Sequence, residues 1–199
     1  MAIPNFPRLV IASGNLGKVA EFQEYFHRSF PDRHWHLLPK PPELEVEETG
    51  ATFAENAILK AVHTAVHTRS WALADDSGLS VHALGGAPGV RSARYGATDP
   101  LRIQRVLREL GTNPDRSAEF VCAIAVADPT GKVEAVAVGT CAGEILHHPR
   151  GDRGFGYDPI FYVPAYGLTF AEMPPDLKNQ ISHRAKALEK LFHILDNLA

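Results

Sequence analysis

Residues 8–18, RLVIASGNLGK, indicate how the fold begins. The run RLVIA has the β-branched and apolar character of a buried strand, and SGNLGK follows it as a turn of small residues. After this turn, apolar side chains recur at helical spacing, at Val19, Phe22, Phe26 and Phe30. Pro31 ends that pattern. The stretch therefore predicts a strand, a turn and a helix in succession.

Strand and helix patterns continue through the next part of the chain. A short strand is expected at residues 35–38, and the sequence TFAE at 52–55 announces a second helix. WALAD, at 71–75, predicts a second buried strand that ends at Asp75 and Asp76. A long glycine-punctuated loop would follow, and loops of that length are commonly functional.

The second half of the chain carries sheet patterns and two more helices. Residues 99–110 form an amphipathic pattern closed by Gly111, and residues 118–145 hold two strand-like runs about DPTG, typical of a hairpin. GDRGFGYDPIFYV, at 151–163, is typical of a glycine-rich turn entering a short strand. The terminal helix is expected to turn these side chains inward: Leu188, Leu191, Ile194, Leu195 and Leu198. Because there is no internal repeat and no linker, we expect one domain over residues 1–199.

Composition limits the classes of partner. The formal net charge is -3 at pH 7, whereas an extended nucleic-acid surface usually carries a basic excess. No stretch approaches the roughly 18 continuous apolar residues of a membrane helix. Cys122 and Cys141 lack the close spacing of a zinc or redox motif. We expect a soluble, cytoplasmic protein that binds neither nucleic acid nor a membrane, but that can bind a small anion.

The first turn has the features of a phosphate site. Ser13, Asn15 and Lys18 stand where a strand passes into a helix amino terminus, which offers backbone N–H groups to an anion. It is not a Walker loop, because only two residues separate Gly14 from Gly17 and no Ser or Thr follows the lysine. The alternative is an ordinary capped helix with a solvated lysine.

Carboxylates gather in two other segments. Glu48, after Glu47, precedes the second helix, and Asp75 and Asp76 end a buried strand, where α/β folds place ligands. Two or three carboxylate oxygens with substrate phosphates are the usual Mg2+ arrangement, and only one of the two aspartates can face the ligand well. Lys60 could reach a second phosphate from the opposite wall. The alternative is a solvated acidic loop with a helix-capping carboxylate.

Aromatic and basic residues cluster near the carboxyl end. Flanking glycines leave Phe155 without bulky neighbours, which suits an aromatic face that stacks on a base, with core packing as the alternative. Lys178, His183 and Arg184 are expected at a helix start, where the macrodipole disfavours cations, so a bound anion or purine carbonyl would compensate them. His63 and His67 have helical spacing for a metal but no third ligand, and are interpreted as a solvated pair.

Five segments, in order, resemble the inosine and xanthosine triphosphate pyrophosphatase family: SGNLGKVAEF, EETGATFAENAILKA, ALADDSGLSVHALGGAPGVRSARYG, GFGYDPIF and KNQISHRAKAL. The resemblance runs from Leu9 to the terminal helix and is weakest over residues 101–150. It implies an α/β fold, a two-lobed single domain with a long mixed twisted β-sheet flanked by helices. It also implies an active-site cleft between the lobes and a homodimer.

The resemblance also implies a role for each candidate residue. The triphosphate would be held by Ser13, Gly14, Asn15, Leu16, Gly17, Lys18 and Lys60. Glu48 and Asp76 would bind Mg2+, and Asp76 would also act as general base. Phe155 would stack on the purine. The remaining substrate contacts would come from Ser77, Gly156, Tyr157, Asp158, Lys178, His183 and Arg184.

The reaction implied is hydrolysis of non-standard purine nucleoside triphosphates (ITP, dITP, XTP) to the monophosphate and pyrophosphate. One alternative is a thymidine or uridine triphosphate pyrophosphatase, but its opening resembles Ser-x-Ser-Pro-Arg-Arg, unlike Ser13-Gly14-Asn15 here. The other is a nucleotide-binding module without catalysis. A pure binder has little reason to surround a polyphosphate with Glu48 and Asp76.

Overall fold

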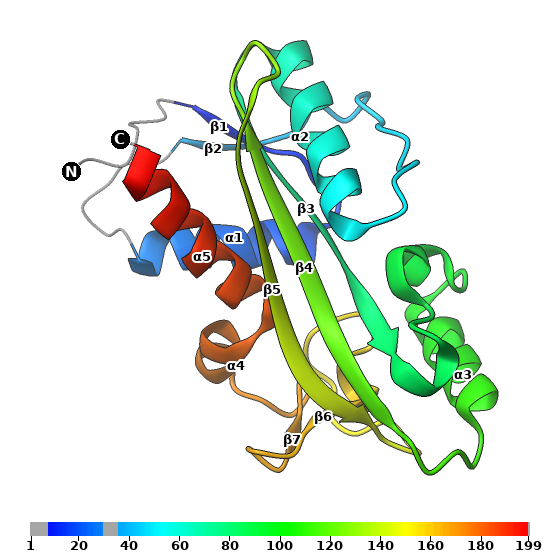
Figure 1. The fold of residues 1–199 in the computed structure, drawn as a ribbon. Helices are drawn as coiled ribbons and strands as arrows, with labels where there is room; N and C mark the ends of the chain where they lie inside the picture. The colour runs from blue at the N-terminus through cyan, green and yellow to red at the C-terminus, as the bar shows by residue number, and fades with distance from the viewer. Residues whose placement is uncertain (1–7, 30–35, 199) are drawn as a thin grey trace. The chain divides into compact units, whose positions relative to one another are not determined.

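The computed structural model describes residues 8–29 and 36–198, and its strands form one seven-stranded sheet in the order β2-β1-β3-β4-β5-β6-β7 (Figure 1). β1 (Leu9–Ile11) pairs in parallel with β2 (Leu37–Pro39) and with β3 (Trp71–Val81). β6 (Phe161–Val163) pairs antiparallel with β5 (Val133–Ile145) and with β7 (Leu168–Thr169). The sheet is therefore mixed, as expected.

The chain forms two compact units. Unit 1 comprises Met1–Asp76, Cys122–Gly139 and Arg184–Ala199, and unit 2 comprises Ser77–Val121 and Thr140–His183. β3, β5 and β4 (Ser117–Ala127) each contribute residues to both units. This division agrees with the two lobes that the family resemblance implies.

In unit 1, side-chain alternation along the strands gives each face of the sheet its own helices (Figure 1). On one face, Leu9, Ile11 and Leu73 pack with α1 (Leu16–Ser29) and α5 (His183–Leu198). On the other face, Val10, Ala72 and Ala74 pack with a row of alanines on α2 (Phe53–Thr68). The helix that a β3 side chain meets therefore depends on whether its position is odd or even.

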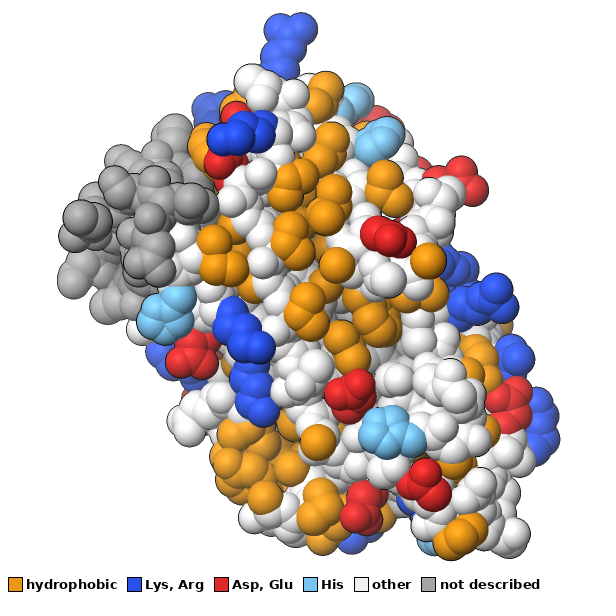
Figure 2. Space-filling model, in the orientation of Figure 1, with side chains coloured by type: hydrophobic (Ala, Val, Ile, Leu, Met, Phe, Trp, Pro, Cys, Tyr) orange, Lys and Arg blue, Asp and Glu red, His pale blue; other side chains and the backbone are white. Residues whose placement is uncertain are grey.

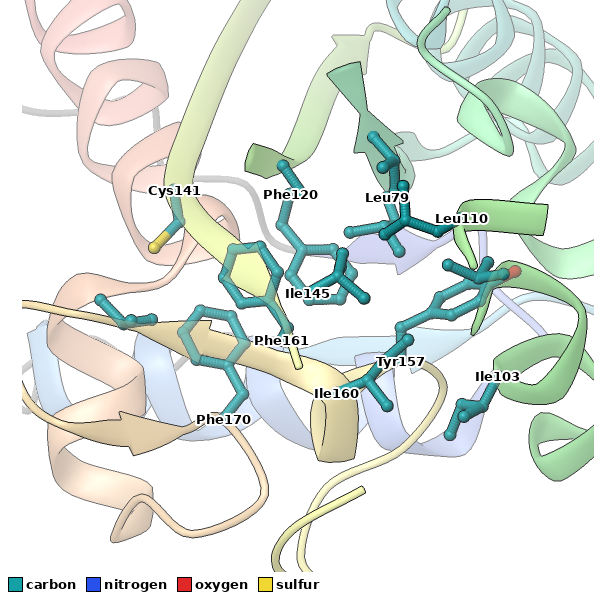
Figure 3. Packing of buried hydrophobic residues seen from close by; sticks show 14 of the residues in the cluster. Leu79, Ile103, Leu110, Phe120, Cys141, Ile145, Tyr157, Ile160, Phe161 and Phe170 are labelled. Atoms are coloured by element: carbon teal, nitrogen blue, oxygen red, sulfur yellow. The ribbon is translucent and has the colours of Figure 1, made fainter. Parts of the chain in front are cut away.

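Unit 2 has an aromatic core. The rings of Phe161 and Phe170 lie 4.5 and 5.6 Å from that of Phe120, centroid to centroid, and Tyr157 is buried in the same cluster (Figure 3). α3 (Asp99–Leu110) contributes Ile103 to this cluster, β3 contributes Leu79, and β5 contributes Ile145. The shorter elements are the 3₁₀ helices η1 (His82–Leu84), η2 (Gly89–Arg94) and η3 (Asp158–Ile160), with α4 (Pro175–Ile181).

Several local predictions are confirmed. Thr52 and Glu55 form a capping box at the start of α2. Gly111 caps α3, and β4 passes into β5 through a turn in which the Asp128 N–H donates to the Lys132 carbonyl at 3.0 Å. His63 and His67 are exposed on α2, as expected of a solvated pair. No helix in the described parts of the chain is long and apolar enough to cross a membrane.

The prediction that the second strand ends at Asp75 and Asp76 is wrong. β3 continues to Val81, and two short 3₁₀ helices stand where a long loop was expected. The strand persists because both carboxylates are paired with cations or amides inside the protein, so neither needs solvent.

The carboxyl-terminal helix also differs from its prediction. α4 precedes α5, and Ser182 separates them, so Lys178 lies in the last turn of α4 while His183 and Arg184 begin α5. Ile194 is exposed rather than inward. Some predictions fall outside the described residues, namely those for Phe30, Pro31 and the side chains of Leu195 and Leu198. The expected strand at residues 35–38 corresponds to β2, which begins at Leu37, and Trp35 itself is not among the described residues.

Candidate active site

The turn before α1 is an Asn-capped helix start. The Asn15 Oδ1 accepts from the Gly17 and Lys18 N–H groups at 2.9 and 3.2 Å, and Ser13 Oγ accepts from the Asn15 N–H at 3.2 Å. Gly14, Asn15 and Leu16 are exposed, Leu16 by 83%. The cap satisfies two of the free N–H groups, and anion binding by this turn stays a prediction.

Asp75 lies on the α1 and α5 face of β3 and is 1% exposed. Its Oδ2 is 2.8 Å from Lys18 Nζ and 3.4 Å from an Arg184 guanidinium nitrogen. Arg184 also pairs with Glu21 of α1. Burial would raise the pKa of Asp75, but Lys18, Arg184 and Lys60 outweigh it and hold that pKa well below its usual range. Asp75 is therefore ionised and holds Lys18 in place.

Asp76 points to the α2 face. Its Oδ2 accepts from Asn56 Nδ2 at 3.0 Å, and its Oδ1 is 3.4 Å from Lys60 Nζ. Lys60 Nζ is also 2.7 Å from Glu48 Oε1. The structure thus brings together Glu48, Lys60 and Asp76, which the sequence analysis placed in one site.

Burial and charge act in opposite directions on this second group. Burial raises the pKa of Asp76, Glu48 adds to the rise, and the opposing effects of Lys60 and Asn56 are smaller. Burial lowers the pKa of Lys60, but Asp76, Asp75 and Glu48 together raise it. Lys60 is therefore cationic, and Asp76 holds its proton more readily than an exposed aspartate does.

The donors around Lys60 fit a hard divalent cation. Glu48 and Asp76 offer carboxylate oxygens within reach of one point, which the Lys60 ammonium occupies. Among the side chains described, those of residues 8–28 and 36–194, there is no group of three or more His, Cys, Asp and Glu that could hold a metal. Mg2+ commonly keeps several waters and binds substrate phosphates, so one or two protein carboxylates are enough for it.

In unit 2, a glycine-flanked loop presents Phe155. Asp158 Oδ2 accepts from the Phe155 N–H at 2.9 Å and from Lys178 Nζ at 2.8 Å. The same ammonium lies 5.1 Å from the centre of the Phe155 ring. Gly154 has a φ of +76°, and a Cβ there would lie 2.0 Å from Asp158 Oδ2, so this position requires glycine. These contacts therefore fix the backbone of the loop, and the loop carries the half-buried ring of Phe155.

Other predicted residues of unit 2 have a packing role in the structure. The Tyr157 hydroxyl donates to the Ser92 carbonyl at 2.9 Å, and burial raises the pKa of that hydroxyl. The His183 ring is buried and stacks on Phe120, with centroids 4.8 Å apart. Ser77 is half-buried in β3. Tyr157 therefore supports the loop from the core side.

The sequence analysis missed several polar residues that hold the site. Glu21 and Asn56 act in unit 1, and Asp99 acts in unit 2, where its Oδ2 accepts from the Gly156 N–H at 2.8 Å. In the sequence each of them is a single polar residue within a helical pattern. Only its burial and its partners from distant segments distinguish it from an ordinary exposed polar residue. The predicted residues form two groups, one in each unit. It stays a prediction that the two groups bind the same substrate molecule.

Comparison with known proteins gives concordant results. A dITP/XTP pyrophosphatase of Nostoc sp. is 57% identical over 184 residues, 92% of each chain. The structure of a HAM1 protein from Coxiella burnetii matches with a TM-score of 0.85 and 47% identity, covering 96% of this chain and 98% of that one. The Staphylococcus aureus Ham1 protein matches with a TM-score of 0.84 and 43% identity, covering 96% and 100%. The model of the Ham1 family matches residues 9–194. This chain therefore belongs to the Ham1 family.

Proposed function

We propose that this protein hydrolyses non-standard purine nucleoside triphosphates, with ITP, dITP and XTP as substrates, to the monophosphate and pyrophosphate. The observation that carries the proposal is the group in unit 1, where two lysines and the carboxylates of Glu48, Asp75 and Asp76 converge at β3. The Nostoc relative is named dITP/XTP pyrophosphatase, which supports the same substrates.

In this proposal Glu48 and Asp76 hold Mg2+. When bound, the ion would neutralise phosphate charge and lower the pKa of a coordinated water. In the structure both carboxylates contact Lys60. Because the lysine side chain is flexible, its ammonium group can turn toward a phosphate, and the two carboxylates can then bind the ion.

The protein's own residues account for the remaining steps. Asp76 would orient the attacking water and accept its proton as the water attacks the α-phosphorus. Lys18 and Lys60 would offset the charge that develops on the leaving pyrophosphate. Asp75 keeps the Lys18 side chain oriented.

Base selection follows from hydrogen-bond types. Inosine and xanthosine carry a carbonyl acceptor at position 6, where adenine carries an amino donor. Donors such as His183 and Arg184 would favour the oxo base, and adenine would leave a buried donor unpaired. In the structure Arg184 pairs with Glu21 and Asp75, and its guanidinium has five N–H donors, so a further hydrogen bond to the base is compatible with both pairs.

The cytoplasmic location and the homodimeric state of the enzyme are part of the proposal. Cys122 and Cys141 are buried thiols that form no disulfide within the described residues, which suits a reducing cytoplasm. Exposed Val133 and Val138 on β5, where hydrophobic side chains gather over β4 and β5 (Figure 2), suit a homodimer contact.

A nucleotide panel tests the proposed function. With Mg2+ present, we expect kcat/KM for ITP, dITP and XTP to exceed that for ATP by at least about 100-fold, because adenine leaves a buried donor unpaired. Equal values for ITP and ATP would contradict the base selection. A preference for TTP or UTP would support the pyrimidine alternative, and binding without product would support the non-catalytic one.

Replacing Phe155 tests base stacking. Base–aromatic stacking contributes about 1–3 kcal/mol, so Phe155→Ala is expected to raise the KM for ITP roughly 5- to 150-fold. Because the ring is remote from the phosphates in this proposal, kcat should change little. Phe155→Trp, which keeps an aromatic face, is the control and should retain the wild-type KM. An unchanged KM for Phe155→Ala would exclude stacking at this position.

A further inference from the structure

Asn56 is a fully buried amide in the second turn of α2, with 0% exposure. Its Nδ2 donates to Asp76 Oδ2 at 3.0 Å, and its Oδ1 accepts from the Gly50 N–H at 2.8 Å. One side chain of α2 therefore joins the strand that carries Asp76 to the segment that carries Glu48.

The chemistry of the two partners fixes the orientation of this amide. An ionised carboxylate only accepts hydrogen bonds and a backbone N–H only donates them, so the Asn56 amide cannot be reversed without losing both bonds. Asp76 Oδ2 is thereby engaged by Asn56. Its other oxygen, Oδ1, is the one that faces Lys60.

The segment before α2 is fitted closely to the same amide. A Cβ on Gly50 would lie 2.7 Å from both Asn56 Oδ1 and Glu55 Cβ, so only glycine allows this approach. Glu55 Oε2 accepts from the N–H groups of Ala51 and Thr52 at 2.6 and 3.2 Å. The backbone two residues after Glu48 is therefore clamped to α2, the helix from which Lys60 projects.

We propose that Asn56 is a positioning residue that selects which oxygen of Asp76 faces the reacting centre and sets the segment of Glu48 relative to it. The inference rests on the proposed function. Residues that orient metal-binding carboxylates by hydrogen bonds typically change activity or metal affinity about 10- to 100-fold when replaced.

Two substitutions separate positioning from structural support. Asn56→Ala removes both hydrogen bonds. Asn56→Asp has nearly the same shape and keeps an acceptor for the Gly50 N–H, but it replaces the donor to Asp76 with a second carboxylate oxygen. Positioning predicts that both variants lose about 10- to 100-fold in kcat for ITP, with the KM for ITP changed less than about three-fold.

Thr64→Val is the matched control. Thr64 lies two turns further along α2 and is fully buried, and its Oγ1 has no hydrogen-bond partner within the described residues. The substitution keeps the shape and removes only that oxygen. Its kcat and KM should stay within about two-fold of wild type, because no site residue loses a contact.

Amide hydrogen exchange of the metal-free proteins gives a readout independent of activity. The Gly50 N–H should exchange faster in Asn56→Ala but keep its protection in Asn56→Asp and Thr64→Val. Full kcat in Asn56→Asp, with Gly50 protected, would show that Asn56 only supports the segment and would overturn the proposal. Wild-type protein that fails to hydrolyse ITP would instead overturn the proposed function.

Discussion

Asp76→Asn is expected to fold like the wild-type protein and to lower kcat for ITP about 10²- to 10⁴-fold, the usual contribution of a general base. Asparagine keeps the shape of the side chain and an acceptor for Asn56, so the packing around this position of β3 should survive. It cannot take a proton from water, and it is a weaker ligand for a divalent cation. Steady-state rates at saturating Mg2+, with unfolding curves for both proteins, measure the effect.

Glu47→Gln is the control for the loss of a carboxylate near this site. Glu47 is exposed and adjoins Glu48 in the chain. Its kcat should stay within about two-fold of wild type, as for most surface changes. A near wild-type kcat for Asp76→Asn at saturating Mg2+ would rule out Asp76 as the base.

Asp75→Ala is expected to lower the free energy of unfolding by about 3–5 kcal/mol, the usual effect of removing one partner from a buried ion pair. The substitution leaves Lys18 without its 2.8 Å partner and removes the Asp75 carboxylate that lies 3.4 Å from Arg184. Urea unfolding at pH 7 measures the difference. A loss below about 1 kcal/mol, the range of exposed pairs, would contradict the account of Asp75.

The pH dependence gives a second check on Asp75. Its pKa is lower in the folded than in the unfolded protein, so its stabilisation is present above the unfolded pKa and is lost as the pH falls through the folded pKa. The stability difference between wild type and Asp75→Ala should therefore be the same at pH 7 and at about pH 5. A difference that grows markedly as the pH falls from 7 to 5 would mean that folding raises the pKa of Asp75, and would contradict a depressed pKa.

Local patterns in the sequence predicted most elements, because strand alternation, helix periodicity and capping act over a few residues. The prediction failed in the middle of β3, where two adjacent acids, Asp75 and Asp76, suggest exposure to solvent and the end of a strand. There Asp75 pairs with α1 and α5, and Asp76 with α2. Those partners come from distant segments, so no local pattern could have indicated that both carboxylates are buried.

The sequence predicted which types of residue make up the candidate site, but not which of them form ion pairs or hydrogen bonds with one another. Glu48, Lys60 and Asp76 lie together as expected. Arg184 was assigned to the base, yet it bridges Glu21 and Asp75 in unit 1. Asn56 was not predicted as a site residue, yet it is fully buried and its amide is paired at both ends. Helical periodicity cannot separate an exposed polar face from one buried by hydrogen bonds.

The products formed from ITP test the central claim most directly. The protein should convert ITP with Mg2+ to IMP and pyrophosphate in equal amounts, lose this activity when a chelator is added, and regain it when Mg2+ is restored in excess. Release of IDP and orthophosphate, or turnover that persists with the chelator, would contradict the arrangement of Glu48, Lys60 and Asp76 as a metal-assisted site acting at the α-phosphorus.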